Sequence, residues 1–152
     1  MGRDPIKVLI VDDHPVFRDG LRRCLEARKE IKVLATVGGG EEMWKALRAH
    51  GRPQIVLMDV EMPGEGGVDL AKALHEKHPD VRVVMLTAFS DSEHVFAALK
   101  AGAVGYLLKN VTPDEIRATV ARAAAGEPML SGEIAGRVLR EFEREREEER
   151  YR

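Results

Sequence analysis

The sequence predicts an α/β protein in which a parallel β-sheet carries helices on both faces. Short runs rich in Val, Ile and Leu recur along the chain, and segments with apolar residues at four-residue spacing lie between them. Short apolar runs of this kind are typical of strands that are buried on both faces. Strands that alternate with helices form parallel sheets, because each helix returns the chain to the start of the next strand.

Five apolar runs are expected to form the strands, and they cover residues 7–11, 33–37, 55–58, 81–87 and 104–108. A helical pattern follows each run. In the first of these helices Phe17, Leu21 and Leu25 recur at four-residue spacing, which places them on one face. The fifth helix has a start signal, because Thr112 is an N-cap residue and Pro113 suits the first turn.

A further helix is expected from about residue 131 to residue 150, after a break at residues 126–132 that contains Pro128. Its apolar stripe consists of Ile134, Val138 and Phe142, and its end alternates Glu with Arg. So narrow a stripe must be buried against the domain or a second chain. We therefore predict one domain over residues 1–126 and a linker or self-association helix over residues 127–152.

Composition limits the classes of protein. A chain of 152 residues with 44% hydrophobic content is long enough for one well-filled core. It contains no apolar run of membrane-spanning length and its first residues do not form a signal peptide, so a cytoplasmic protein without membrane contact is expected. The net charge is −2, with six Glu against four Arg in residues 141–152, and this balance argues against nucleic-acid binding by this portion alone.

Polar residues follow four of the five predicted strands, at the point where each strand ends. They are Asp12 and Asp13, Asp59, Thr87, and Lys109. Ligands bind outside the carboxyl ends of the strands in parallel α/β sheets, so these side chains are expected to meet at one edge. Crowded carboxylates repel one another unless a cation neutralises them, and oxygen ligands without cysteine suit Mg²⁺.

The same residue types are suited to phosphoryl chemistry. Lys109 supplies a positive charge and Thr87 a donor, which can hold an anion beside the metal. An aspartate can be the nucleophile that forms an acyl phosphate, and Asp59 is the favoured acceptor because a glycine-rich turn follows it. The simpler interpretation of Asp12 and Asp13 is a turn or a helix cap, and capping and metal binding are compatible.

Four segments together resemble the receiver domain of bacterial two-component response regulators over residues 5–126. These segments are VLIVDDHP, LMDVEMPGEGG, VVMLTAFS and AGAVGYLLK, in this order. The first and last resemble most the NarL/LuxR-type subgroup, whose members usually carry a helix-turn-helix DNA-binding domain after a linker. The resemblance implies a flavodoxin-like sheet of five strands in the order 2-1-3-4-5, with an extra C-terminal helix.

The resemblance also implies a role for individual residues. Asp59 matches the phosphoacceptor, Asp13 a direct Mg²⁺ ligand, and Asp12 its partner, which acts largely through water. Four further positions match the family's site: Glu61, whose backbone carbonyl completes the metal shell; Lys109, which pairs with the phosphoryl group; Thr87, which moves onto that group; and Tyr106, which turns inward when Thr87 moves. Ala88 matches a position that is kept small for phosphoryl access.

The expected function is a switch rather than an enzyme with turnover. A sensor histidine kinase is the expected phosphate donor, a second copy of the chain is a candidate partner, and DNA would be bound only through an output domain outside this chain. One alternative is a stand-alone adaptor that acts by protein contact. Another is a haloacid-dehalogenase-like phosphatase, but that family needs a second Asp where this chain has Glu61.

Overall fold

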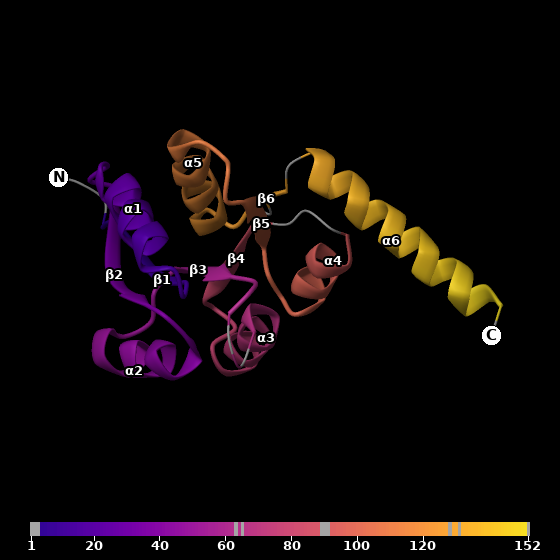
Figure 1. Ribbon diagram of the computed structural model, residues 1–152, viewed down its shortest axis with the longest axis horizontal. Coiled ribbons are helices and arrows are strands. Elements are labelled where there is room, and N and C mark those ends of the chain that lie inside the picture. Colours follow the sequence, from indigo (N-terminus) through magenta and orange to yellow (C-terminus); the bar gives the residue numbers. More distant parts are fainter. Residues whose placement is uncertain are drawn as a thin grey trace.

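The computed structural model describes residues 4–62, 64, 66–88, 92–127, 129–130 and 132–151. One parallel sheet runs through the middle of the molecule (Figure 1). Its strands are β1 (Ile6–Val11), β2 (Ile31–Val37), β3 (Ile55–Asp59), β4 (Arg82–Thr87), β5 (Gly105–Leu108) and β6 (Met129–Leu130), in the order β2-β1-β3-β4-β5-β6. The predicted order 2-1-3-4-5 is confirmed, and β3 lies in the middle of those five strands.

Helices cover both faces of the sheet (Figure 1). They are α1 (Pro15–Glu26), α2 (Gly40–His50), α3 (Gly67–Lys77), α4 (Ser92–Lys100), α5 (Pro113–Ala124) and α6 (Gly132–Arg150). The helices α1 and α5 lie on one face, where Leu25 and Val120 pack with Ile10 of β1. The helices α2, α3 and α4 lie on the other face, where Met43 and Leu74 belong to a second apolar cluster.

Alternate residues of each central strand point to opposite clusters, which explains why the strands are apolar on both faces. In β1, Val8 and Ile10 belong to the cluster under α1 and α5, whereas Leu9 and Val11 belong to the other. All five residues of β3 are buried. The strand β3 is therefore a fully buried central strand, and it ends at Asp59.

The strand β6 was not among the strands predicted from the sequence. It has only two residues, and it pairs in parallel with Gly105 and Tyr106 of β5. A pair of residues has no detectable periodicity, and the glycines and Pro128 around it resemble a break. The pairing adds a sixth strand at the edge of the predicted five-stranded sheet.

The helix α6 extends away from the sheet beyond β6 (Figure 1) and packs against α4. Val138 is buried, and the rings of Phe142 and Phe96 meet edge to face with centroids 4.8 Å apart. Lys100 of α4 also forms an ion pair with Glu145 of α6. The third residue of the predicted stripe, Ile134, has a side chain outside the described part of the structure.

No helix within the described residues combines the length and the apolar character that a membrane span requires.

Candidate functional site

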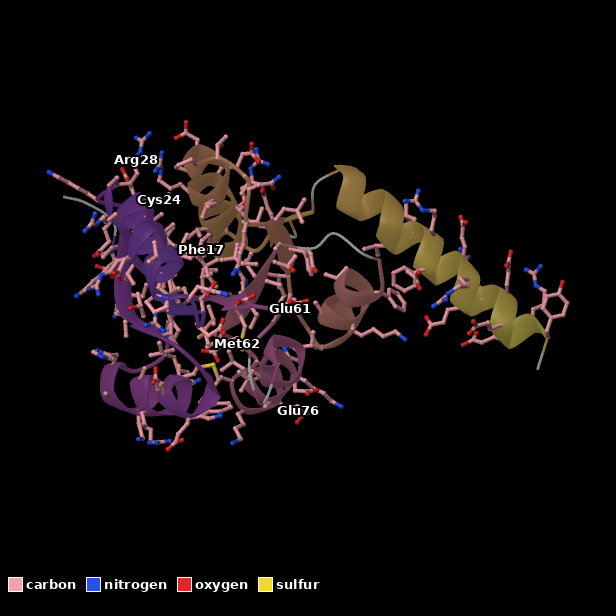
Figure 2. All side chains as sticks on the ribbon, viewed as in Figure 1. Phe17, Cys24, Arg28, Glu61, Met62 and Glu76 are labelled. Carbon is pink, nitrogen blue, oxygen red and sulfur yellow. The ribbon has the colours of Figure 1, made fainter. Side chains whose placement is uncertain are left out.

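A pocket of about 450 Å³ lies at the carboxyl ends of the strands. It is lined by residues that end or follow β1, β3, β4 and β5: Asp13, His14, Asp59, Val60, Glu61, Met62, Thr87, Ala88 and Lys109. Glu61 and Met62 belong to the stretch directly after β3 (Figure 2). The structure thus brings together residues separated by almost a hundred positions, as the strand-end pattern predicted.

Three carboxylates meet at this pocket. Asp12 is fully buried and Asp59 is 2% exposed, whereas the side chain of Asp13 is 26% exposed. Backbone hydrogen bonds position them, because the Asp12 N–H donates to the Val37 carbonyl over 2.9 Å. The Val60 N–H, next to Asp59, donates to Leu86 of β4 over 3.0 Å. Both buried aspartates are therefore anchored at ends of hydrogen-bonded strands.

Lys109 places a positive charge among these carboxylates. Its Nζ lies 2.9 Å from Asp12 Oδ2 and 3.3 Å from Asp59 Oδ2. Burial acts to lower the pKa of Lys109, but its close ion pairs with Asp12 and Asp59 outweigh burial and raise the pKa above the ordinary value. The ammonium group is thus held in its charged form.

The Asp59 carboxylate is destabilised in its charged form. Burial, followed by repulsion from Asp12, raises the pKa of Asp59 from 3.8 to about 6. The hydrogen bond from the Glu61 N–H to Asp59 Oδ1, at 3.1 Å, and the charge of Lys109 act in the opposite direction but do not cancel the increase. A group that adds positive charge here would relieve this cost.

Three carboxylate oxygens at this site can still accept a hydrogen bond or bind a cation. Asp12 Oδ2, Asp13 Oδ1 and Asp59 Oδ2 are buried but accept no well-aligned hydrogen bond among the described residues. The contact of Lys109 with Asp12 Oδ2 is therefore best described as an ion pair. One oxygen from each aspartate, together with a His14 nitrogen, lies within 4.8 Å of the others. This donor set fits a small divalent cation with oxygen ligands.

Thr87 lines the pocket at the end of β4, and Tyr106 lies on the neighbouring strand β5. Thr87 ends β4 and is 2% exposed, and its carbonyl accepts the Lys109 N–H over 2.7 Å. Tyr106 does not line the pocket, because it is fully buried in the apolar cluster under α2, α3 and α4. Its backbone pairs with Met85 of β4, two residues before Thr87. The two residues are thus linked through adjacent strands.

Gly67, the first residue of α3, makes a close approach that only glycine allows. A Cβ atom at this position would lie 2.0 Å from the backbone oxygen of Asp59. The Gly67 N–H also donates to the Val60 carbonyl over 3.0 Å. The tight return of the chain after β3 therefore depends on the missing side chain.

Three contacts of the first helix were not expected from the sequence. Phe17 was predicted only as a member of an apolar stripe on α1 (Figure 2), yet Lys109 Nζ lies 4.6 Å from its ring centroid. Arg18 Nη1 donates to the Asp12 carbonyl over 2.9 Å. His14 points its Nδ1 at the carboxylates. The only sequence signal was their closeness to the Asp12–Asp13 pair.

Comparison with known proteins identifies this arrangement. The model of the response regulator receiver domain matches residues 8–121, which include all the predicted site residues. The chain belongs to this family. It is 39% identical over 142 residues to the transcriptional regulatory protein LnrK of Bacillus subtilis. The matched residues make up 93% of this chain and 64% of LnrK.

Two solved structures confirm the resemblance of this receiver domain to the NarL/LuxR subgroup. The signal receiver domain of the response regulator NarL from Mycobacterium tuberculosis is 33% identical, with a TM-score of 0.77 over 82% of this chain and 100% of that one. A LuxR-family two-component response regulator from Aurantimonas sp. SI85-9A1 is 30% identical, with a TM-score of 0.83 over 91% of this chain and 98% of that one. The present chain spans less than two thirds of the curated relatives it matches.

Proposed function

We propose that this receiver domain accepts a phosphoryl group on Asp59 from a phosphohistidine of a partner sensor histidine kinase. One observation carries the proposal: the buried Asp59 carboxylate lies 3.3 Å from Lys109 Nζ and is clustered with the carboxylates of Asp12 and Asp13. A nucleophilic carboxylate, a fixed cation and further acidic groups are the parts that acyl phosphate formation requires.

In the proposed reaction an Asp59 carboxylate oxygen attacks phosphorus as the phosphorus–nitrogen bond to the kinase imidazole breaks. The imidazole leaves with the bonding electron pair and takes up a proton from water. Lys109 stabilises the charge on the transferred group, because its ammonium already lies within 3.3 Å of the attacking carboxylate. Ala88 is exposed at the rim and leaves room for the donor.

We propose Mg²⁺ as the cofactor. The carboxylates of Asp12, Asp13 and Asp59 and the backbone carbonyl of Glu61 would hold it, with Asp12 acting largely through water. When bound, the ion supplies positive charge that keeps the carboxylates ionised and offsets the charge of the incoming phosphoryl group. The buried carboxylate oxygens without a well-aligned hydrogen bond support this assignment.

The proposed switch uses Thr87, Lys109 and Tyr106. A phosphoryl dianion attracts the Lys109 ammonium and the Thr87 hydroxyl more strongly than a carboxylate does, so it favours the arrangement in which both contact it. The space that Thr87 vacates is then available to the Tyr106 side chain, which is already fully buried. The faces of the domain near β4 and β5 would change with these side chains.

The output is proposed to be transcriptional, through a DNA-binding domain beyond residues 1–152. Several relatives are named as transcriptional regulators, and those relatives are longer than this chain. Residues 1–126 would form the receiver and residues 127–152 a linker or self-association helix, with a homodimer as the candidate assembly. A stand-alone adaptor is the second candidate, because α6 already packs on α4. Membership of the receiver family argues against a phosphatase.

The test is phosphorylation by acetyl phosphate with Mg²⁺, followed by intact mass measurement. One acid-labile phosphoryl group is expected on the wild type and on the control Asp80→Asn, whose carboxylate is exposed and pairs with Arg52. No phosphoryl group is expected on Asp59→Asn. Modification that persists in Asp59→Asn at the wild-type level would place the acceptor elsewhere.

A further inference from the structure

A histidine nitrogen joins the carboxylates of the pocket. His14 Nδ1 lies 3.0 Å from Asp12 Oδ1, 3.2 Å from Asp13 Oδ1 and 3.6 Å from Asp59 Oδ2. One ligand atom from each of these four residues lies within 4.8 Å of the others. The nitrogen therefore approaches one oxygen of every aspartate in the site.

These distances resemble those between neighbouring ligands of one ion. Bonds of about 2.1 Å at right angles around an octahedral cation place adjacent ligand atoms about 3.0 Å apart. The distances from His14 Nδ1 to Asp12 and Asp13 are 3.0 and 3.2 Å. The buried Asp12 and Asp59 each retain an oxygen without a well-aligned hydrogen bond, so the group has donor capacity for an ion.

Helix capping does not account for the orientation of the His14 ring. His14 is the N-cap residue of α1, but its side chain forms no capping hydrogen bond. Its backbone N–H instead donates to Asp12 Oδ1 over 2.8 Å, which fixes the backbone beside the pocket, and Pro15 begins the helix. The ring is 63% exposed, and its Nδ1 is within hydrogen-bonding distance of Asp12 Oδ1, at 3.0 Å. A bound ion would take the place of that hydrogen bond.

From this geometry we infer that His14 is a further metal ligand, through Nδ1, and that it makes the site prefer Mn²⁺ or Co²⁺ over Mg²⁺. The inference rests on the proposed cation site and adds to it a residue that selects the metal. Mg²⁺ prefers oxygen ligands and its own water, whereas imidazole suits the first-row transition metals. For coordination the neutral ring carries its proton on Nε2, so that the lone pair of Nδ1 is available.

The experiment compares metal binding by the wild type, His14→Ala and the control His50→Ala, an exposed histidine at the end of α2. Affinities for Mg²⁺ and Mn²⁺ are measured by calorimetry at about pH 8, where an imidazole free in solution is neutral. Pulsed electron paramagnetic resonance of bound Mn²⁺ detects a coordinated nitrogen directly. Circular dichroism verifies that each variant is folded.

The His14→Ala variant should bind Mn²⁺ at least about tenfold more weakly than the wild type does, which is the lower end of the loss seen when a group that supports a metal site is removed. Its affinity for Mg²⁺ should be nearly that of the wild type. Its bound Mn²⁺ should show no nitrogen coupling, whereas wild type and His50→Ala should show it. Equal effects on both metals, or nitrogen coupling that survives in His14→Ala, would overturn the role of His14. Asp13→Ala separates the two proposals: if it leaves Mg²⁺ binding unchanged, the cation site itself is wrong.

Discussion

Replacing Asp59 with asparagine is expected to stabilise the folded domain when no divalent cation is present. Burial and repulsion from Asp12 raise the pKa of Asp59 from 3.8 to about 6 in the folded state. The folded protein then binds this proton more tightly than the unfolded chain does, so ionisation costs stability as the pH rises through this range. Asparagine cannot ionise, and its side-chain oxygen can still accept the Glu61 N–H.

The size of the effect follows from the pKa shift. One pKa unit corresponds to about 1.4 kcal/mol, so the shift from 3.8 to about 6 predicts a gain of about 3 kcal/mol above pH 7. The gain should be about half as large at pH 5 and should vanish below the unfolded-state pKa. For a domain of this size it corresponds to an increase in Tm of roughly 6–12 °C.

Urea denaturation of both proteins between about pH 5 and pH 7.5, with a chelator present, measures the difference. Asp80→Asn is the control, because the exposed Asp80 carboxylate has a lowered pKa, set mainly by a backbone hydrogen bond and also by Arg52. That substitution removes a favourable charge and should not stabilise the fold. Equal stability of wild type and Asp59→Asn at every pH would show that Lys109 fully compensates the Asp59 charge, and would refute the reasoning.

Three further predictions concern the switch and the helix α6. Lys109→Ala should leave some phosphate incorporation at Asp59 but reduce the conformational response, read as loss of most amide shift changes on phosphorylation by NMR; an unchanged response would remove Lys109 from the switch. Thr87→Ala should be phosphorylated to a similar extent, while the shift changes around Tyr106 fall by half or more, and a full wild-type response there would contradict its role. Truncation after Gly126 should preserve Mg²⁺ affinity within about twofold and change the oligomeric state or output, as measured by calorimetry and light scattering. Loss of folding in that variant would make α6 part of the core, since Val138 of α6 is buried.

The apolar pattern of the sequence determined the layered fold and the edge at which the site forms. The runs that end at Asp12, Asp59 and Thr87 are buried on both faces, and a buried parallel strand needs an apolar run of this kind. Once the strands are parallel, their carboxyl ends meet at one edge, so the positions of Asp13 and Lys109 followed from the chain alone. Position along the sequence was sufficient because each of these residues lies at the end of a strand or within two positions after it.

Only the tertiary structure decided the contacts between side chains from different elements. The same stripe on α1 holds Leu21, which packs in the core, and Phe17, whose ring faces Lys109 at 4.6 Å. Helical spacing assigns a face to both residues but cannot identify what that face meets after folding. The pairing of β6 with β5 and the 3.6 Å approach of His14 to Asp59 have the same origin, because each depends on the packing of segments distant in sequence rather than on a local pattern.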